Sequence, residues 1–273
     1  MTTTQPDTTL LWNPQDVVPA AEALRTGRVQ ITETTQASVP TLTADNATGK
    51  SVFFVAGEVV FGGQQDRIVT DSFIVPPGEA IIPVACVEAG RWSGSAAFEA
   101  RTGLGPRRLR HGAVIGGRTG GTVDQSNVWS VVDEVLTAAQ TAHPTGSLRA
   151  SVERDDDQLD AMVALAPLPG QCGVAIGLRD KVIGVELFTS QAVLVSYWEP
   201  IMRSYALDNS DAYRGRPSLG RVLRFIRTAV DGLQPVPLPK AGHGHQFRVA
   251  TKSFVANALV SENTLVHLVV LAA

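Results

Sequence analysis

The sequence has little of what marks several large classes of protein. Its 273 residues include only two cysteines, Cys86 and Cys172, which argues against a disulfide-stabilised secreted fold and for two reduced thiols. No apolar run approaches the roughly 20 residues that cross a bilayer. The formal net charge of −3 gives no overall attraction to nucleic acid or to an anionic membrane. We therefore expect a cytoplasmic protein that binds neither.

What is present is the composition of an ordinary globular protein. Hydrophobic residues make up 44% of the chain and charged residues 18%, and the length allows a sizeable core. Residues 1–9 are polar and rich in threonine, lack the pattern of a signal peptide, and are expected to form a short disordered lead-in. We find no internal repeat, and only the glycine-rich residues 103–121 resemble a linker. Residues 10–273 are therefore predicted to form a single α+β domain.

The first part of the chain has the pattern of a strand-rich, antiparallel layer. Apolar residues recur at helical spacing over residues 14–27, and Gly27 is a typical stop signal. In residues 67–75, alternating side chains predict one continuous strand with one buried face. Strands at close spacing, separated by turn residues, favour hairpin connections. They are predicted at residues 29–34, 39–44, 51–56, 58–61, 67–75 and 79–86.

The remainder alternates between helical and strand-like segments. Residues 101–127 are rich in glycine and arginine and are predicted to form a long loop with one short strand at 113–115. The last strand is nearly all apolar and is expected to be central, covered on both faces. Helices are predicted at residues 125–142, 155–164, 191–207 and 219–233. Strands are predicted at residues 172–178, 181–188, 245–251, 254–261 and 265–271. The fold class is therefore α+β, mostly antiparallel, with several packed helices.

The densest group of polar side chains lies in residues 57–92, at the turns between predicted strands. Glycines let the backbone turn tightly or approach a ligand, while Glu, Gln and Arg supply hydrogen-bonding groups. Gln125 and Trp129 lie one helical turn apart and can face the same site. The candidate ligand-binding residues are Glu58, Gln65, Arg67, Glu88, Arg91, Trp92, Gln125 and Trp129. The alternative is a set of solvated turns, with Trp92 and Trp129 packed in the core.

Three side chains in this region are also candidates for catalysis. Glu58 or Glu88 could act as a general base, and Cys86 could act as a nucleophile if a base or a positive field lowered its pKa. Cys86 and Glu88 lie two residues apart in a predicted strand and therefore share a face. The alternatives are a buried structural cysteine and a supporting ion pair between Glu88 and Arg91.

Spacing argues against several common sites. The turn at 57–67 lacks the Lys-Ser/Thr ending of a P-loop, and the glycines of 116–121 do not form a dinucleotide fingerprint. The arginines of 101–118 could bind phosphate or be solvated. His243 and His245 share a strand face but have no third ligand at metal spacing, and His267 is predicted to be a hydrogen-bonded core residue. We expect no metal and no cofactor.

Three segments combine into a family signature: GEVVFGGQQDR at 57–67, VPPG at 75–78 and CVEAGRW at 86–92. They resemble the ARG and rhodanese-phosphatase-superfamily-associated protein domain, and looser matches continue to residues 266–268. The family usually has asparagine at the position of Asp66. It is named for its genomic association with ADP-ribosylglycohydrolases and rhodanese or phosphatase-type proteins. The resemblance implies a setting in nucleotide or ADP-ribose metabolism, and it assigns no reaction or catalytic residue.

Three functions are therefore open. The leading hypothesis is an accessory domain that binds a nucleotide-like or ADP-ribose-related small molecule, with Arg67 and Arg91 on anionic oxygens and a tryptophan stacked on the base. The second is a hydrolase acting on such a molecule, and the third is a structural or partner-docking module without a ligand. A buried Glu88–Arg91 pair without an adjoining cavity favours the third. A cavity lined by Glu58, Arg67 and Arg91 favours the first two. The oligomeric state is left open.

Overall fold

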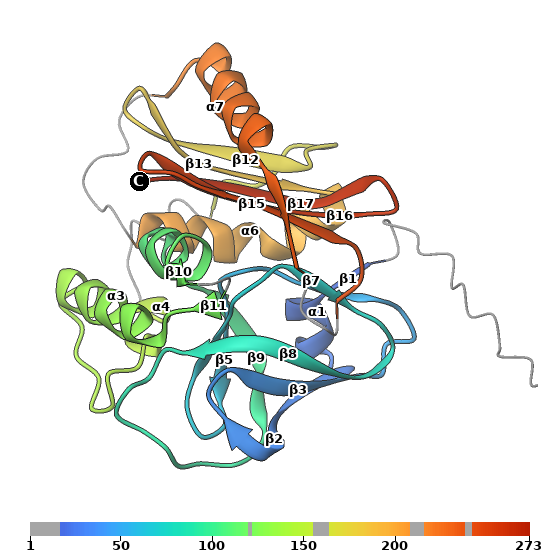
Figure 1. Ribbon diagram of the computed structural model, residues 1–273, viewed down its shortest axis with the longest axis vertical. Helices are drawn as coiled ribbons and strands as arrows, with labels where there is room; N and C mark the ends of the chain where they lie inside the picture. Colours follow the sequence, from blue (N-terminus) through green and yellow to red (C-terminus); the bar gives the residue numbers. More distant parts are fainter. Residues whose placement is uncertain (1–16, 120–121, 155–163, 208–215, 238–241) are drawn as a thin grey trace, which may run out of the picture.

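Two six-stranded antiparallel sheets form the frame of the protein (Figure 1). The computed structural model describes residues 17–119, 122–154, 164–207, 216–237 and 242–273. The first sheet has the strand order β2-β3-β8-β6-β5-β9, and the second has the order β12-β13-β17-β16-β15-β14. Within the described residues only β1 and β4 pair in parallel. The predicted α+β class, mostly antiparallel, is confirmed.

The first sheet is formed by residues 29–104. Its strands are β2 (Val29–Ser38), β3 (Thr41–Asn46), β5 (Glu58–Gly62), β6 (Arg67–Val69), β8 (Gly78–Cys86) and β9 (Phe98–Leu104). A bridge between Thr32 and Ala97 brings the two edge strands together, so the sheet curls strongly. Beside it lie the short helix α1 (Ala20–Arg25) and a small sheet of β1 (Val18–Pro19), β4 (Val52–Phe54) and β7 (Phe73–Val75).

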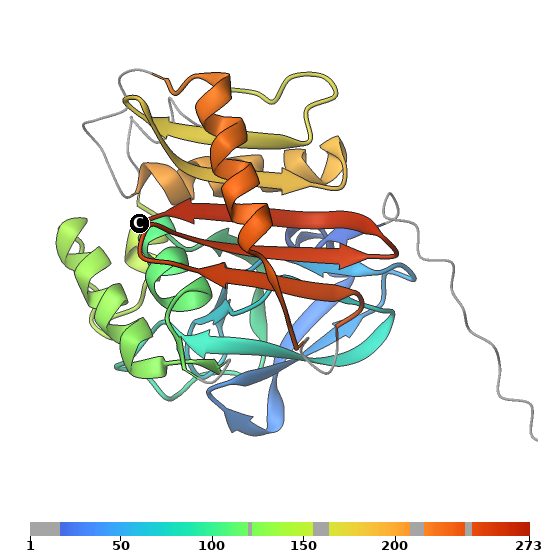
Figure 2. The same ribbon diagram turned by 45° about the horizontal axis from the view of Figure 1, so that its top comes forward.

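The second sheet is formed by the C-terminal part of the chain. Its strands are β12 (Gly173–Leu178), β13 (Lys181–Phe188), β14 (Gln234–Val236), β15 (His245–Ala250), β16 (Phe254–Ser261) and β17 (Thr264–Ala272). Helix α6 (Gln191–Ala206) lies between this sheet and the first half of the chain, and α7 (Leu219–Gly232) crosses the opposite face (Figures 1 and 2). Strand β17 is internal and its residues 266–271 are buried, which confirms the prediction of a central, covered strand.

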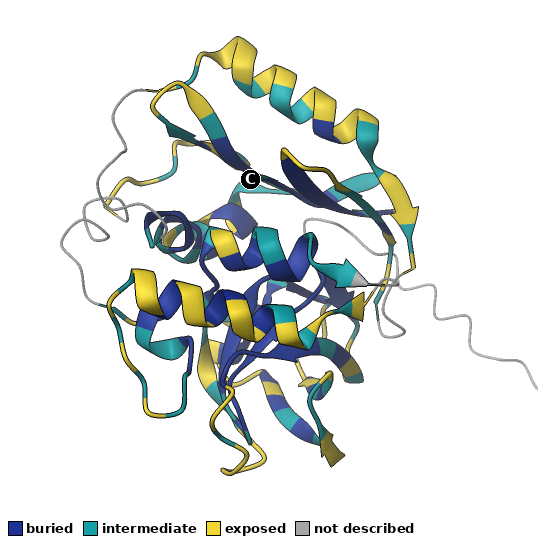
Figure 3. Ribbon diagram, turned by 60° about the vertical axis from the view of Figure 1, so that its left-hand side comes forward, coloured by how far each residue is buried: buried dark blue, intermediate teal, exposed yellow. Residues whose placement is uncertain are grey.

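Short elements connect the two sheets. They are α2 (Arg107–Leu109), the π-helix η2 (Arg110–Ile115), β10 (Arg118–Thr119), β11 (Thr122–Val123), α3 (Gln125–Ala138) and α4 (Arg149–Val152). Helix α3 begins after Asp124, whose carboxylate accepts hydrogen bonds from the first free amides of the helix. The predicted apolar side of this helix is buried, whereas its outer side is exposed, as it is in α7 (Figure 3).

The largest hydrophobic cluster joins the two halves of the chain. It contains Phe53 and Leu104 from the first half together with Val269 and Leu271 from the last strand. A smaller cluster fills the space between the second sheet and α7. The assignment of residues 10–273 to one domain stays a prediction, and the predicted lead-in at 1–9 lies outside the described residues.

The single strand predicted at residues 67–75 is wrong. The chain forms β6 in the first sheet, leaves it at Thr70, and enters β7 in the three-stranded sheet at Phe73. Both short strands are buried on both sides, and so are Asp71 and Ser72 between them. The alternation of side chains over residues 67–75 predicted one long strand. The same alternation also arises when the chain forms two short strands in different sheets, joined by buried polar residues.

The long loop predicted at residues 101–127 is also wrong. Part of it belongs to β9, and the predicted short strand at 113–115 is the end of the π-helix η2. This helix buries Arg110 with no exposed surface. Arginine and glycine indicated a solvated loop, but a buried ion pair fixes the segment instead.

The helix predicted at 14–27 is shorter than expected, because α1 begins only after Pro19. Gly27 follows it with a φ of 68°, as its predicted stop role requires. The helix predicted at 155–164 falls almost entirely on residues 155–163, which lie outside the described part, and α4 and β14 were not predicted. Among the described helices, none combines the length and apolar character needed to cross a bilayer.

Candidate functional site

The two polar turns predicted from the sequence meet at the carboxylate of Glu88. Arg91 reaches it with two nitrogens, Nε at 2.8 Å from Oε1 and Nη2 at 2.5 Å from Oε2. The Thr145 hydroxyl donates to Oε1 at 2.5 Å, and the amide of Asp66 donates to Oε2 at 2.9 Å. Every acceptor direction of this buried carboxylate therefore has a donor.

A second carboxylate extends the network. Asp66 accepts hydrogen bonds from the Gly62 amide at 2.7 Å and the Ser147 hydroxyl at 2.6 Å, and Arg149 lies 3.3 Å away. Arg91 also donates to the carbonyl oxygen of Gly63 at 2.7 Å. The network therefore ties the turn at 62–67 to the turn at 88–93 and to the segment around residue 147.

The electrostatic surroundings of Glu88 indicate that it has a bracing role, in which its carboxylate stabilises the two turns. Burial acts to raise its pKa, but the hydrogen bonds from Arg91, Thr145 and the Asp66 amide outweigh burial and hold the pKa below its ordinary value. A carboxylate that is ionised and fully bonded has no free lone pair with which to accept a proton from a substrate. Of the alternatives that the sequence left open, the ion pair between Glu88 and Arg91 is present.

Replacing Glu88 by glutamine is expected to lower the free energy of unfolding by about 1–3 kcal/mol, because it removes charge-assisted hydrogen bonds inside a buried network. Urea denaturation followed by circular dichroism measures the loss. Glu79→Gln, at an exposed position of β8, is the matched control. An unchanged midpoint for Glu88→Gln would contradict the bracing role.

Arg67 is the other focus of the predicted site, and its guanidinium is fully buried. Its Nη1 donates to the carbonyl oxygen of Gln65 at 2.9 Å and to the Gln65 side chain at 3.3 Å. Its Nε and Nη2 have no hydrogen-bond partner among the described residues. Glu33 balances the charge from 3.7 Å, beyond hydrogen-bond distance of Nη2. One edge of the guanidinium is thus anchored, and the edge that can bind an oxyanion with two parallel hydrogen bonds is unfilled.

Two predicted residues, Trp92 and Cys86, lie beside this guanidinium, and a third, Trp129, lies beside Cys86. The ring of Trp92, half exposed, lies over it with 5.6 Å between the ring centroid and Cζ. The Cys86 thiol donates to the carbonyl oxygen of Glu88 at 3.2 Å, and burial raises the pKa of this thiol. A buried thiol with a raised pKa is a poor nucleophile, although Arg67 acts in the opposite direction. Trp129, partly exposed on α3, contacts the same thiol.

Gln125 holds the end of β8 next to this group. Its side-chain amide accepts from the Cys86 amide and donates to the Cys86 carbonyl oxygen, both at 2.8 Å. These two bonds continue the ladder of β8 beyond the point at which β3 ends. Gln125 and Trp129 thus both contact Cys86, a residue that was not predicted as their partner, and the two side chains face the same place, as their spacing predicted.

Glu58 lies apart from these residues. Its carboxylate is buried beside α6, where Oε2 accepts from the Val55 amide and from the Tyr197 hydroxyl, both at 3.2 Å. Its Oε1 has no partner among the described residues. Burial raises the pKa of Glu58 to about 7. The preceding residue must be glycine, because a Cβ on Gly57 would lie 2.6 Å from the side chain of Arg110.

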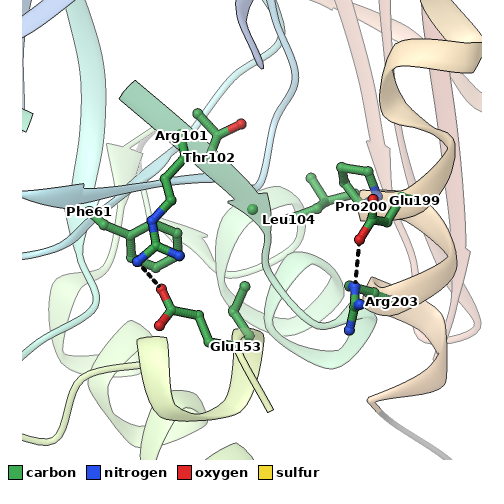
Figure 4. A pocket seen from close by; sticks show the side chains of 10 residues that line it. Phe61, Arg101, Thr102, Leu104, Glu153, Glu199, Pro200 and Arg203 are labelled. Carbon is green, nitrogen blue, oxygen red and sulfur yellow. Dashed lines mark hydrogen bonds and ion pairs between the residues drawn. The ribbon is translucent and has the colours of Figure 1, made fainter. Parts of the chain in front are cut away.

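Three cavities lie elsewhere on the described surface, with volumes of about 340, 380 and 700 Å³. The first lies between β9 and α6, where Arg101 extends over Phe61 toward Glu153 and faces the Glu199–Arg203 pair (Figure 4). Of the predicted ligand-binding residues, Gln125 lines the largest of these cavities, and none of the three is lined by the other seven. Within the described residues, no group of three or more His, Cys, Asp or Glu side chains could hold a metal ion.

Comparison with protein-family models matches residues 7–271 to the ARG and Rhodanese-Phosphatase-superfamily-associated Protein domain. The chain belongs to this family. Searches of curated proteins and of solved structures gave no match. The family description names an association and no reaction, so the chemistry of this ARG and Rhodanese-Phosphatase-superfamily-associated domain must be inferred from its residues.

The domain also contains a buried polar network that the sequence did not indicate as a whole. Glu186 accepts from Arg110 Nη1 at 2.7 Å through Oε1 and lies 2.9 Å from His267 Nε2 through Oε2. The other nitrogen of His267 is 3.1 Å from the Ser72 hydroxyl. His267 is therefore a hydrogen-bonded core residue, as predicted. The only sequence signals for the rest were single charged residues in apolar surroundings, Glu186 in a strand and Arg110 beside Leu109.

Ser72, His267 and Glu186 have the order of a nucleophile, base and orienting carboxylate. All three side chains have no exposed surface, and none lines one of the three cavities. The Ser72 hydroxyl also accepts the amide of Ala56 at 3.0 Å. Because no substrate can reach this serine in the observed conformation, we assign the network to structure.

Proposed function

We propose that this domain is an accessory module that binds a nucleotide-like anion, of the ADP-ribose class, at Arg67. The observation that carries the proposal is one edge of a fully buried guanidinium, whose Nε and Nη2 have no hydrogen-bond partner among the described residues, with Glu33 3.7 Å from Nη2. A phosphate offers two oxygens at the spacing of these two donors. A buried donor without an acceptor costs free energy, and a ligand oxygen would remove that cost.

Aromatic rings beside Arg67 support a ligand that carries a base. Trp92 has 52% and Trp129 39% of its surface exposed, and both contact the Arg67–Cys86 pair. Exposed tryptophans provide a stacking face for a planar ring. Because Trp92 covers the guanidinium, its ring must move aside when the ligand enters. Gln65, Glu88 and Arg91 hold the two turns in place during this movement.

The proposal is tested by calorimetry with ADP-ribose, AMP and adenosine. ADP-ribose and AMP are expected to bind, whereas adenosine, which lacks the phosphate, is expected to bind at least about tenfold more weakly. Arg67→Lys retains the charge but loses the two-donor edge, so it should weaken phosphate binding by a similar factor. Arg224→Lys, on the exposed side of α7, is the matched control. Equal binding by the wild type and Arg67→Lys would reject the site.

The alternative of a hydrolase rests on one observation, the pKa of about 7 of Glu58, which suits a general base. Glu88 and Cys86 do not favour it, because one is fully bonded and the other has a raised pKa. Turnover of ADP-ribose that Glu58→Gln abolishes would replace the accessory role with a hydrolytic one. The third function, a structural or docking module, is supported by the Glu88–Arg91 pair and by the three described cavities, none of which is lined by Glu58, Arg67 or Arg91. Absence of both binding and turnover would select this function.

A further inference from the structure

The largest of the three cavities has a chemistry of its own. It has a volume of about 700 Å³ and lies between the end of β8, the β10–β11 hairpin and the β14–β15 hairpin. This volume is in the range of small-molecule sites. Most of its wall is apolar and none of its lining side chains is aromatic; the wall includes Pro40, Pro83, Val84, Val123, Val236 and Pro237.

The charged part of the cavity wall is one carboxylate between two arginines. Oδ1 of Asp71 lies 3.0 Å from Nη2 of Arg118 and 2.6 Å from Nη2 of Arg248. Both arginine side chains are nearly buried, with 9% and 12% of their surface exposed. The two guanidiniums therefore share one oxygen of a single carboxylate. Burial and the neighbouring Arg118 both lower the pKa of Arg248, as expected where positive charge is not fully compensated.

Arg248 also has a hydrogen-bond donor without a partner among the described residues. Its Nη2 is bound to Asp71, but its Nε has no partner among the described residues. Arg118 is fixed by the carbonyl oxygens of Thr70 and Val114 in addition to Asp71. Arg248 is also slightly more exposed than Arg118, 12% against 9%, so it is the arginine that a ligand in the cavity reaches more readily.

We propose that this cavity binds a small monocarboxylate with an apolar body. The ligand carboxylate accepts from Arg248, which shares its own carboxylate partner with Arg118, while the body packs against the valine and proline walls. A nucleotide does not suit this cavity, because its base finds no aromatic ring among the lining residues. This cavity is separate from the site at Arg67, so an experiment can reject either proposal without rejecting the other.

The test uses the wild-type protein with benzoate and octanoate, the neutral analogues benzyl alcohol and octanol, and inorganic phosphate. Saturation-transfer NMR detects binding and calorimetry measures affinity. We expect the carboxylates to bind at least about tenfold more tightly than the alcohols and phosphate. If the alcohols bind equally well, the charge plays no part and the proposal fails. If phosphate binds as tightly, the ligand class is wrong.

Variants of the residues that line this cavity test whether the carboxylates bind there. Arg248→Gln removes the charge, and Val236→Trp places a large side chain in the cavity from a partly exposed position of its wall. Both are expected to weaken carboxylate binding at least about tenfold, whereas Arg224→Gln on α7 leaves it unchanged. Asp71→Asn removes the competing carboxylate and should tighten binding. Melting curves show which variants fold, and a folded Val236→Trp protein that still binds benzoate as the wild type does would overturn the proposal.

Discussion

Replacing Arg110 by methionine is expected to lower the free energy of unfolding by about 3–5 kcal/mol, as is typical when one partner of a buried ion pair is removed. Arg110 and Glu186 both have no exposed surface and are joined at 2.7 Å. Methionine keeps most of the apolar volume of the arginine stem, so the loss measures the stranded carboxylate more than a cavity. Urea unfolding with a check of the m-value gives the difference.

The pH dependence of the stability difference between the wild type and Arg110→Met tests whether the uncompensated Glu186 carboxylate causes that difference. Burial acts to raise the pKa of Glu186, but Arg110 and His267 outweigh burial and hold it below the ordinary value of 4.5. The pair therefore stabilises the wild type above pH 4.5, and this stabilisation is lost as the pH falls through the folded-state pKa. In Arg110→Met the carboxylate takes up a proton at higher pH. The difference between the two proteins should consequently shrink as the pH is lowered.

A double variant provides the control. Arg110→Met combined with Glu186→Met removes both charges, and part of the lost stability should return, because no uncompensated carboxylate is left. His267 and Tyr205 still lose a partner, so the recovery is incomplete. A double variant less stable than Arg110→Met would show that Glu186 stabilises the fold without its arginine, which contradicts the mechanism.

The pattern of apolar residues was a good guide to the sheets and a poor guide to the segments that connect them. Strands such as β16 and β17 alternate or are uniformly apolar, and local periodicity records this directly. The segments at 67–75 and 101–127 were misassigned for one reason: their polar residues are buried against partners far away in the chain. Arg248 binds Asp71 across 177 residues, and Glu186 binds Arg110 across 76. Periodicity contains no information about such pairs.

The same distinction applies to the candidate site. Gln65 with Arg67, and Glu88 with Arg91, are two and three residues apart, and sequence reasoning grouped them correctly. Glu33, Thr145 and Arg149 complete the network from distant segments and were missed. Glu58 was grouped with them because it is near in sequence, but its side chain lies against α6. A residue's neighbours in a curled sheet are set by strand pairing, which the sequence alone does not supply.

Glu58 should make the stability of the protein fall as the pH rises. Burial raises its pKa from 4.5 to about 7, and the hydrogen bonds from Val55, Thr102 and Tyr197 oppose this only in part. A carboxyl whose folded-state pKa is raised contributes stability that is complete below the unfolded-state pKa and is lost as the pH passes the folded-state value. A change from 4.5 to about 7 corresponds to roughly 3 kcal/mol, lost between about pH 4.5 and 8.

Glutamine at position 58 separates this effect from all other titrations. Glu58→Gln resembles the protonated acid in shape and does not ionise, so the variant should lack this decline and exceed the wild type in relative stability above pH 7. Unfolding midpoints in urea at intervals of half a pH unit measure both profiles, with Glu79→Gln on exposed β8 as the control. The test compares the slopes of stability against pH. A change in stability that the new amide causes equally at every pH therefore does not affect the result. Parallel profiles for wild type and Glu58→Gln would mean that Glu58 ionises near its ordinary pKa and that burial does not destabilise the carboxylate.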